Sequence, residues 1–265
     1  MTEATATTGT TSELTGELAT DLPSRRISWS GALVTPLVLA AALALLFWYL
    51  AAQDLDDIEQ RSINADTILT HLREHIALVA VSSVLVIVIA VPLGVLLTRP
   101  GLSAVTRPLV GLANIGQAVP SIGILVLLAV TVGIGFDMAI VALVLVAVLP
   151  VLRNTMIGLS TVDKSLIDAA RGMGLTRTSV LLRVELPLAV PVILAGIRIA
   201  LILNVSSATL ATFTNAGGLG TLIATGVALN RFPILITGSV LTAVLALAID
   251  WLAGLAERAL RPRGI

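Results

Sequence analysis

Cysteine, aromatic side chains and charge are all scarce in this sequence of 265 residues. It has no cysteine, which excludes disulfides, thiolate metal sites and cysteine nucleophiles. Only 3% of the residues are aromatic and 12% are charged, and the formal net charge is zero, so no basic field favours nucleic acid as a partner. Hydrophobic residues, by contrast, make up 57% of the chain, and the mean hydropathy is +1.03. These values are typical of an integral membrane protein.

Six long apolar runs predict six membrane-spanning helices. A helix needs about 20 apolar residues to cross about 30 Å of hydrocarbon, and the longer runs supply them without a charge. The shorter fourth and sixth runs are bounded by Arg153 and Asp250, and they span if those charges lie at an interface. The runs are 27–53, 76–98, 108–136, 138–152, 199–230 and 232–249. The predicted fold is therefore all-α, a polytopic membrane helix bundle of about six transmembrane helices.

The charges outside these runs predict an orientation. Residues 1–26 lack the basic start and apolar core of a cleaved signal peptide, and we expect them to form a disordered cytoplasmic tail before a transmembrane domain at 27–265. If the chain starts inside and crosses six times, most basic residues fall on the inside, as the positive-inside rule expects, and both termini are cytoplasmic. The inner basic residues are Arg25, Arg26, Arg99, Arg107, Arg153, Lys164, Arg171, Arg177, Arg183, Arg258, Arg261 and Arg263.

One cytoplasmic loop, about 160–187, is too long and too polar for a simple connection. It contains "DAARGMGLTRTSVLLRVELP", in which 162–170 predicts a short helix that Gly172 and Gly174 end. Thr176 can cap a second short helix, which we expect Pro187 to stop. Two short helices joined by a glycine turn form a compact protrusion, here called the knob, to which a partner outside the membrane can bind.

The loop resembles the cytoplasmic loop of ABC importer permeases, which reads Glu-Ala-Ala, then Gly, then Ile-x-Leu-Pro. The spacing matches throughout, and the two departures, Asp for Glu and Val for Ile, preserve charge and shape. The matching residues are Asp168, Ala169, Ala170, Gly174, Val184, Leu186 and Pro187. Three further segments, "GQAVPSIGILVLL", "NAGGLGTLI" and "ERALRPRG", resemble permeases that import glycine betaine, carnitine or choline, although permeases for methionine and other amino acids carry similar segments. The resemblance covers about 69–264.

The resemblance implies a type I ABC importer permease in a prokaryotic inner or plasma membrane. It implies that the matching loop residues couple to separate ATPase subunits, that an external binding protein delivers the solute, and that the bundle pairs with a second copy or a related permease. ATP and Mg²⁺ would then bind the partner ATPase, because the chain itself has no G-x-x-x-x-G-K-[ST] loop. We expect no catalysis, cofactor or metal in this chain, and among its other partners we expect membrane lipid but no nucleic acid.

Polar residues inside the apolar runs are candidates for the translocation path. They are Asn114, Gln117, Pro120, Ser121, Arg198 and Asn204. A proline-broken helix beside polar groups is tolerated where it faces protein or a water-filled cavity, but the same groups can merely bond helices together. Arg198 either pairs with Asp250 or lines a gate, or it lies at the inner interface if the fifth span begins only near Ala195.

There are three other interpretations besides the importer: a metal site, an ion-coupled carrier and a membrane scaffold. His71 and His75 have a spacing that sometimes binds metal, but no third ligand is well placed, and the start of a helix at the interface explains them. An ion-coupled secondary carrier would be expected to show inverted repeats and intramembrane carboxylates, of which only Asp250 is a candidate. A membrane scaffold would need neither a polar path nor the matched loop.

Overall fold

The computed structural model describes residues 29–99, 101, 102, 106, 108, 111 and 119–260. The chain divides into two units, Met1–Val34 and Thr35–Ile265. The described part of the first unit is the first turns of α2 (Trp29–Ala51), and every other described residue belongs to the second unit. The predicted tail, 1–26, lies outside the described residues and remains a prediction.

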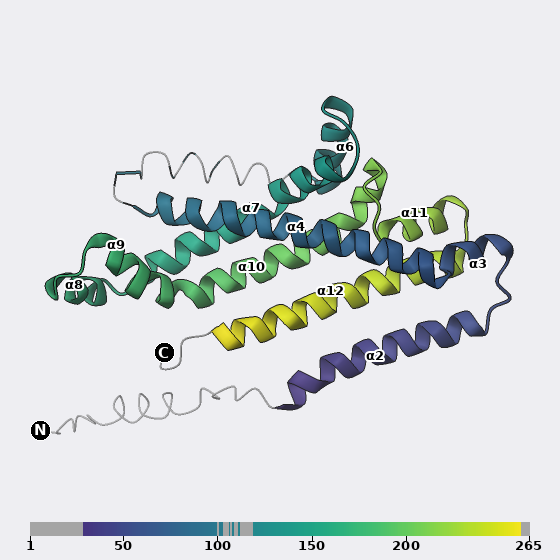
Figure 1. Cartoon of the computed structure of the whole chain (residues 1–265), viewed down its shortest axis with the longest axis horizontal. Coiled ribbons are helices and arrows are strands. Elements are labelled where there is room, and N and C mark those ends of the chain that lie inside the picture. The colour runs from purple at the N-terminus through teal and green to yellow at the C-terminus, as the bar shows by residue number, and fades with distance from the viewer. Residues whose placement is uncertain are drawn as a thin grey trace, which may run out of the picture. The chain divides into compact units, whose positions relative to one another are not determined.

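The described residues form helices and no strands, which confirms the predicted all-α class (Figure 1). After α2 come α3 (Asp57–Ile63), α4 (Ala65–Leu97), α6 (Ser121–Thr131), α7 (Phe136–Ser160), α8 (Lys164–Gly172), α9 (Arg177–Val180), the π-turn η1 (Leu181–Glu185), α10 (Leu186–Ala208), the 3₁₀ turn η2 (Thr209–Thr214), α11 (Gly220–Ala228) and α12 (Phe232–Leu260). Five of these stretches are long and apolar enough to cross a membrane: Leu33–Ala51, Ala65–Leu97, Phe136–Ser160, Arg177–Thr214 and Phe232–Leu260. Much of the predicted third run lies outside the described residues, and its described part contains the shorter α6.

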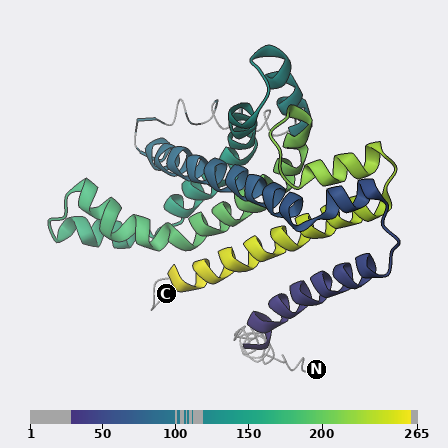
Figure 2. The ribbon, with the colours of Figure 1, turned by 45° about the vertical axis from the view of Figure 1, so that its right-hand side comes forward.

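Helices α4, α7 and α10 pack together along their lengths, and α12 packs on α10 and α11 (Figures 1 and 2). Lipid tails are as apolar as leucine, so close backbone contact rather than hydrophobic exclusion drives such packing, and small residues allow it. A Cβ added at Gly196 of α10 would lie 2.5 Å from the Asn154 Cβ of α7. A Cβ at Gly94 of α4 would lie 2.7 Å from the Thr155 Cβ. These glycines set how closely the three helices approach.

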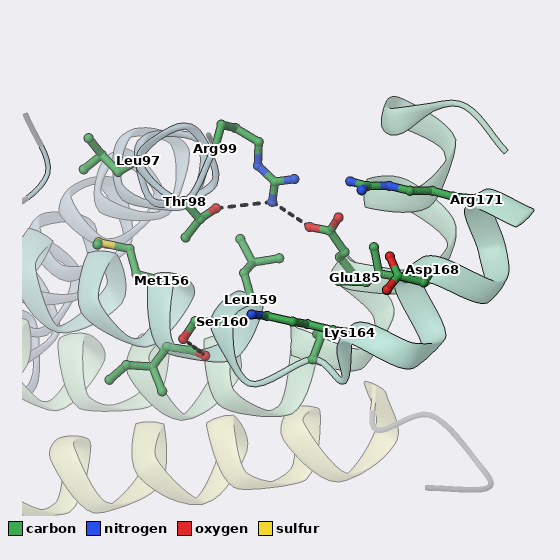
Figure 3. A pocket seen from close by; sticks show the side chains of 13 residues that line it. Leu97, Thr98, Arg99, Met156, Leu159, Ser160, Lys164, Asp168, Arg171 and Glu185 are labelled. Atoms are coloured by element: carbon green, nitrogen blue, oxygen red, sulfur yellow. Dashed lines mark hydrogen bonds and ion pairs between the residues drawn. The ribbon is translucent and has the colours of Figure 1, made fainter. Parts of the chain in front are cut away.

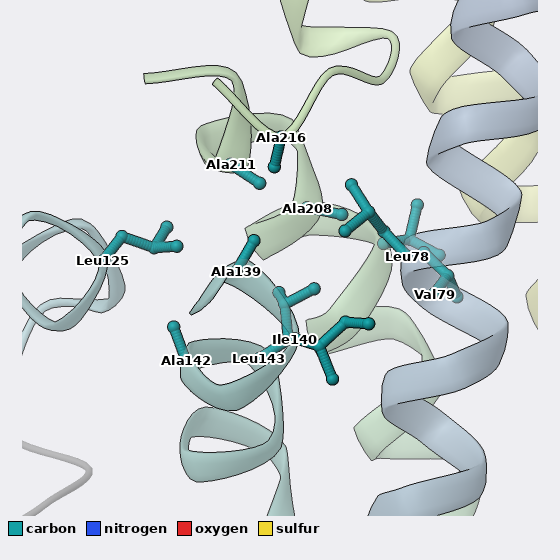
Figure 4. Packing of buried hydrophobic residues seen from close by; sticks show 11 residues of the cluster. Leu78, Val79, Leu125, Ala139, Ile140, Ala142, Leu143, Ala208, Ala211 and Ala216 are labelled. Carbon is teal, nitrogen blue, oxygen red and sulfur yellow. The ribbon is translucent and has the colours of Figure 1, made fainter. Parts of the chain in front are cut away.

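A cluster of buried side chains closes one end of this three-helix core (Figure 4). Leu78 and Val79 extend from α4 toward Ile140 and Leu143 of α7. Alanines from the end of α10, from η2 and from the turn after it complete the cluster: Ala208, Ala211 and Ala216. The large side chains of α4 and α7 thus fill the space beside the small alanines at the end of α10 and in η2.

The predicted fifth span takes up only the first part of the uncharged run 199–230. Helix α10 ends at Ala208, η2 continues to Thr214, and the chain then turns through Asn215, Gly217 and Gly218, all with positive φ, before α11. Left-handed backbone is tolerated by glycine and, among other residues, best by asparagine. The uncharged run therefore contains a helix end, a turn and a second short helix. Hydropathy alone does not show where the chain changes direction.

The first predicted span, 27–53, contains α2, and the second, fourth and sixth are correct in place but shorter than their helices. Helix α7 continues past the predicted limit at Leu152 through Arg153 to Ser160, α4 begins at Ala65 rather than Ile76, and α12 runs on to Leu260. A charge does not end a helix, because backbone hydrogen bonds continue while the charged head extends to the interface. A count of uncharged residues finds only the segment that must lie in hydrocarbon.

Candidate functional site

The predicted knob forms from α8, α9 and the turn between them. Asp163 caps α8 by accepting a hydrogen bond from the Ser165 amide at 2.8 Å, and this bond, with one from the Ser165 hydroxyl, lowers the pKa of the Asp163 carboxyl. The helix ends at Gly172, and Gly174 follows with φ of +85° while its N–H donates to the Arg171 carbonyl. A left-handed glycine after a helix end is a common way to satisfy the last carbonyls. The glycine turn is as predicted.

Pro187 does not stop the second helix, contrary to expectation. Thr176 caps α9 as predicted, accepting from the Ser179 amide at 3.3 Å, but the chain then continues through η1 directly into α10. A proline inside a helix lacks an N–H and its ring collides with a carbonyl one turn back. The wider π-turn stands just before Pro187, with the Leu186 N–H bonded to the Leu181 carbonyl. The second helix of the knob, α9, is thus continuous with α10 in one helical stretch, Arg177–Thr214.

The residues of the matched pattern divide by exposure. Asp168, Ala169 and Gly174 are exposed, Ala170 is buried, and Val184, Leu186 and Pro187 are half-buried. Nothing lies within 4 Å of a Cβ built on Gly174. The apolar side chains of Leu166, Met173 and Leu182 are exposed. The pattern therefore joins a few residues that hold the knob together to an outer surface of small, acidic and apolar groups.

A cavity of about 660 Å³ lies between the knob and the ends of α4 and α7 (Figure 3). Arg99, just beyond α4, donates from its Nη2 to the Glu185 Oε2 at 2.6 Å, and Arg171 points toward the same carboxylate from α8. Arg99 also donates through Nε to the Val95 carbonyl at the end of α4. Glu185 is buried on η1. The ion pair therefore joins the last turn of α4 to the segment that connects the knob with α10.

Arg99 and Glu185 were not among the predicted site residues. They are far apart in the chain, and each alone looks like an ordinary charge at the end of an apolar run. Glu185 is the unspecified position between Val184 and Leu186 of the pattern, so the resemblance did not assign it a role. The only available signal was a carboxylate directly before a membrane-spanning segment, where a charge needs a partner.

The structure forms the predicted pair between Arg198 and Asp250. The Arg198 Nε lies 2.5 Å from Asp250 Oδ1 and its Nη2 lies 2.8 Å from Oδ2, a bidentate arrangement between α10 and α12. Glu257, farther along α12, is 3.7 Å from the Arg198 Nη1. The helix is continuous from Arg177, but a helix can begin outside the membrane, so the alternative that the span begins only near Ala195 remains a prediction. A role for Arg198 in translocation remains a prediction.

The other predicted path residues are placed in part. Asn204 is fully buried and donates to the Ser83 hydroxyl of α4 at 2.9 Å, a geometry that fits the interhelical alternative. Pro120 and Ser121 lie at the start of α6, with Pro120 exposed. Asn114 and Gln117 lie outside the described residues. The described residues thus leave the predicted path scattered rather than gathered around one channel.

A second, polar pocket of about 400 Å³ lies near the start of α4, at the opposite end of that helix from Arg99. It is lined by His71, Glu74, Thr212, Asn215, Ala216, Gly217 and Thr221. The Glu74 Oε2 accepts from the Gly218 amide at 2.8 Å and lies 3.0 Å from the His71 Nδ1. His75 is turned away to the α10 backbone, with its Nε2 3.1 Å from the Val205 carbonyl. The two histidines therefore do not face a common ligand, and among the described residues no three candidate ligands gather.

Comparison with known proteins places the chain in a family. A family model described as binding-protein-dependent transport system inner membrane component matches residues 90–262. The osmoprotectant import permease protein OsmY of Salmonella typhimurium is 39% identical over 230 residues, 86% of this chain and 94% of that protein. The glycine betaine/carnitine/choline transport system permease protein OpuCB of Bacillus subtilis is 41% identical over 204 residues, 76% of this chain and 92% of that one.

Solved structures agree with the relatives on the fold. An inward-facing structure of the MetNI methionine ABC transporter aligns with a TM-score of 0.65 and 29% identity, covering 74% of this chain and 96% of that one. A structure of an amino acid ABC transporter with histidines aligns with a TM-score of 0.64 at 17% identity, which supports the fold alone. The bundle of helices with its protruding knob is the fold of ABC importer permeases. The chain belongs to the family of binding-protein-dependent transport system inner membrane components.

Proposed function

We propose that this chain is the translocation subunit of an ATP-driven importer and that its solute is glycine betaine or a related quaternary-ammonium osmoprotectant. The observation that carries the proposal is the knob of α8 and α9, which stands at one end of the bundle and presents the exposed residues Asp168 and Gly174 (Figure 1). A surface with open space around Gly174 and apolar side chains beside it suits a groove on a second protein. The relatives named for osmoprotectant transport support the choice of solute.

The ATPase subunits are the partners that this knob fits. The chain has no phosphate-binding loop of the G-x-x-x-x-G-K-[ST] form, so ATP and Mg²⁺ belong to the partner. Helix α9 continues without a break into α10, so a displacement of the knob on the partner moves a membrane-spanning helix directly. Asp168, Ala169, Ala170, Gly174, Val184, Leu186 and Pro187 form this coupling segment, with the first residues at the surface and the last at the junction with the bundle.

The knob end of the bundle faces the cytoplasm in this proposal. Arg99, Lys164 and Arg171 gather there around the cavity, in keeping with the bias of basic residues toward the cytoplasmic side. The pocket at Glu74 then opens at the outer face, where an external binding protein delivers the solute. A second permease, identical or related, completes the pore, and the assembly resides in a prokaryotic inner or plasma membrane.

The scarcity of aromatic residues bears on where the solute is selected. Proteins hold a quaternary ammonium group most tightly in an aromatic cage through cation–π contacts, and only 3% of this chain is aromatic. Strong selection therefore belongs to the external binding protein, and the permease accepts what it delivers. The methionine transporter similarity makes an amino acid the second candidate solute.

Replacement of Gly174 by arginine tests the coupling role. The added side chain would project into the open space that the partner occupies, and it would also strain a backbone with φ of +85°. We expect insertion to persist and ATP-driven uptake to fall about tenfold or more, equivalent to about 1.4 kcal/mol or more of lost coupling. Gly101→Arg is the matched control, because Gly101 also has positive φ, at +94°, and open space but lies outside the pattern.

The three classes of function separate in this experiment. An importer loses uptake in Gly174→Arg and keeps it in Gly101→Arg. An ion-coupled carrier continues to accumulate solute in both variants when ATP is depleted and the ion gradient is held. A scaffold accumulates nothing in any form, the unaltered chain included.

A further inference from the structure

The pocket at the start of α4 has a composition unlike the rest of the bundle. Its described lining includes one carboxylate, one imidazole, two hydroxyls and one amide. The hydroxyls of Thr212 and Thr221 bond each other at 3.0 Å, and so close the wall between η2 and α11. Glu74 is the sole acidic group among the lining residues. The pocket therefore has a single carboxylate, with the His71 imidazole beside it and hydroxyl and amide groups around it.

The depth of Glu74 follows from the length of α4. The uncharged stretch 76–98 separates Glu74 from Arg99, and at 1.5 Å per residue it spans about 35 Å, close to the hydrocarbon thickness of a bilayer. With Arg99 at one interface, Glu74 lies at the other. The pocket is thus at the membrane surface opposite the knob, where a solute would enter the bundle from outside.

The Glu74 carboxylate is held in position. Its Oε2 accepts a hydrogen bond from the Gly218 amide, and the His71 Nδ1 lies 3.0 Å from the same oxygen. Gly217 packs so closely that a Cβ there would collide with the carboxylate, and its φ of +77° is one that other residues rarely adopt. The side chain nevertheless stays 39% exposed. A fixed but accessible charge can meet a ligand without first being ordered.

We propose that the Glu74 pocket is the entry site of the permease and that it receives the cationic head of a quaternary-ammonium solute. This inference rests on the proposed function. A quaternary ammonium group has no N–H to donate, so charge and van der Waals contact are its means of recognition, and a carboxylate supplies the charge. The neutral hydroxyl and amide groups accept the rest of the solute. No aromatic residue is among the described lining residues, so binding is loose, as transit requires.

Glu74→Gln separates the charge from the structural bond. The amide oxygen of glutamine still accepts the Gly218 N–H, whereas the negative charge is lost. The whole permease–ATPase complex in lipid nanodiscs, without the binding protein, is titrated with labelled choline. We expect at least a tenfold weaker dissociation constant in Glu74→Gln, and partial recovery in Glu74→Asp. In the unaltered complex 3,3-dimethylbutan-1-ol, the neutral carbon analogue of choline, should fail to displace the label.

Asp66→Asn is the matched control, because Asp66 is an exposed carboxylate in the first turn of the same helix and is not among the pocket residues. An equal loss of choline affinity in Asp66→Asn and Glu74→Gln would show that any surface carboxylate has this effect, and it would overturn the entry site. So would unchanged binding in Glu74→Gln, or displacement by the neutral analogue.

A transport assay distinguishes failure of this inference from failure of the proposed function. With saturating solute-loaded binding protein, the unaltered complex should import choline or glycine betaine at the expense of ATP, and Glu74→Gln should import it more slowly. Import at equal rates by both complexes overturns the entry site alone. No ATP-driven import by the unaltered complex overturns both.

Discussion

Arg99 and Glu185 lie 86 positions apart in the sequence and form an ion pair of 2.6 Å that joins the end of α4 to η1. The Glu185 side chain is only 8% exposed. A buried carboxylate that loses its partner costs about 3–5 kcal/mol in a dry protein interior, and because Arg99 is 30% exposed we expect the lower end of that range. Arg99→Ala should therefore lower the thermal stability of the purified chain, measured by unfolding in detergent.

The same pair has a consequence for transport. It is a second connection between the knob and the bundle, in addition to the helix that runs into α10. Glu185→Gln should let the complex assemble and hydrolyse ATP but import less solute per ATP, and the exchange Arg99→Glu with Glu185→Arg should restore part of the loss. Arg73→Ala is the control, because Arg73 is exposed near the other end of α4. An unchanged ratio of import to hydrolysis would contradict the connection.

A second prediction concerns the pair of Arg198 and Asp250. A charge left alone in a membrane span is costly, by about 2.5–3.5 kcal/mol on insertion scales, so Arg198→Met and Asp250→Leu should each destabilise the bundle. The double variant removes both charges and should be more stable than either single variant. A double-mutant cycle measured by unfolding in detergent gives the coupling energy. If the changes in the free energy of unfolding are additive, the interaction between Arg198 and Asp250 contributes nothing to stability.

A test of translocation uses the same residue. If Arg198 takes part in the path as well as in the pair, Arg198→Met with Asp250→Leu should remain folded and transport slowly. Transport by this double variant at the original rate would assign the pair a purely structural role.

Helix packing gives a third prediction. A methyl group at Gly196 would lie 2.5 Å from the Asn154 Cβ and 3.0 Å from the Pro150 carbonyl oxygen, so α10 and α7 would have to separate. Gly196→Ala should therefore destabilise the chain by about 1–3 kcal/mol. In Gly254→Ala the added methyl meets the Arg198 guanidinium at 3.5 Å or more, an ordinary contact. Unfolding midpoints of the two variants that shift equally would contradict the packing argument.

The cap of α8 gives a fourth prediction, on pH. Hydrogen bonds from Ser165 lower the pKa of the Asp163 carboxyl from its ordinary value of 3.8. A carboxyl with a lowered pKa in the folded state stabilises that state above its ordinary pKa, and the contribution is lost as pH falls through the lower value. Hydrogen-exchange protection of α8 should hold from neutral pH to about 3.8 and decline below it. Asp163→Asn keeps a capping oxygen and should remove this pH dependence; a parallel decline in both chains would refute the assignment.

The knob could be predicted from sequence because its rules are local. Asp163, Thr176 and Gly174 each act on neighbours within a few residues, and capping and positive φ leave a clear mark on residue type. Arg198 and Asp250 were also predicted as partners, since a bundle interior offers few ways to satisfy a charge.

Other contacts could not be predicted, because nothing local encodes them. Glu74 and Gly218 are 144 positions apart, and their bond depends on how α4 meets the turn before α11. The course of the chain through Pro187 was missed because a proline has two outcomes, a stop or a wider turn, and the choice depends on packing around η1. The turn after α10 lies inside an uncharged run, where its glycines and not the hydropathy mark it, since hydropathy measures composition and not direction.

The most direct test of the proposed function is uptake of labelled glycine betaine into proteoliposomes that contain this chain, its ATPase subunits and its binding protein. The proposal predicts accumulation that requires ATP on the side of the knob, persists when ion gradients are collapsed, and is lost when this chain is omitted. Accumulation that follows an ion gradient without ATP would contradict it.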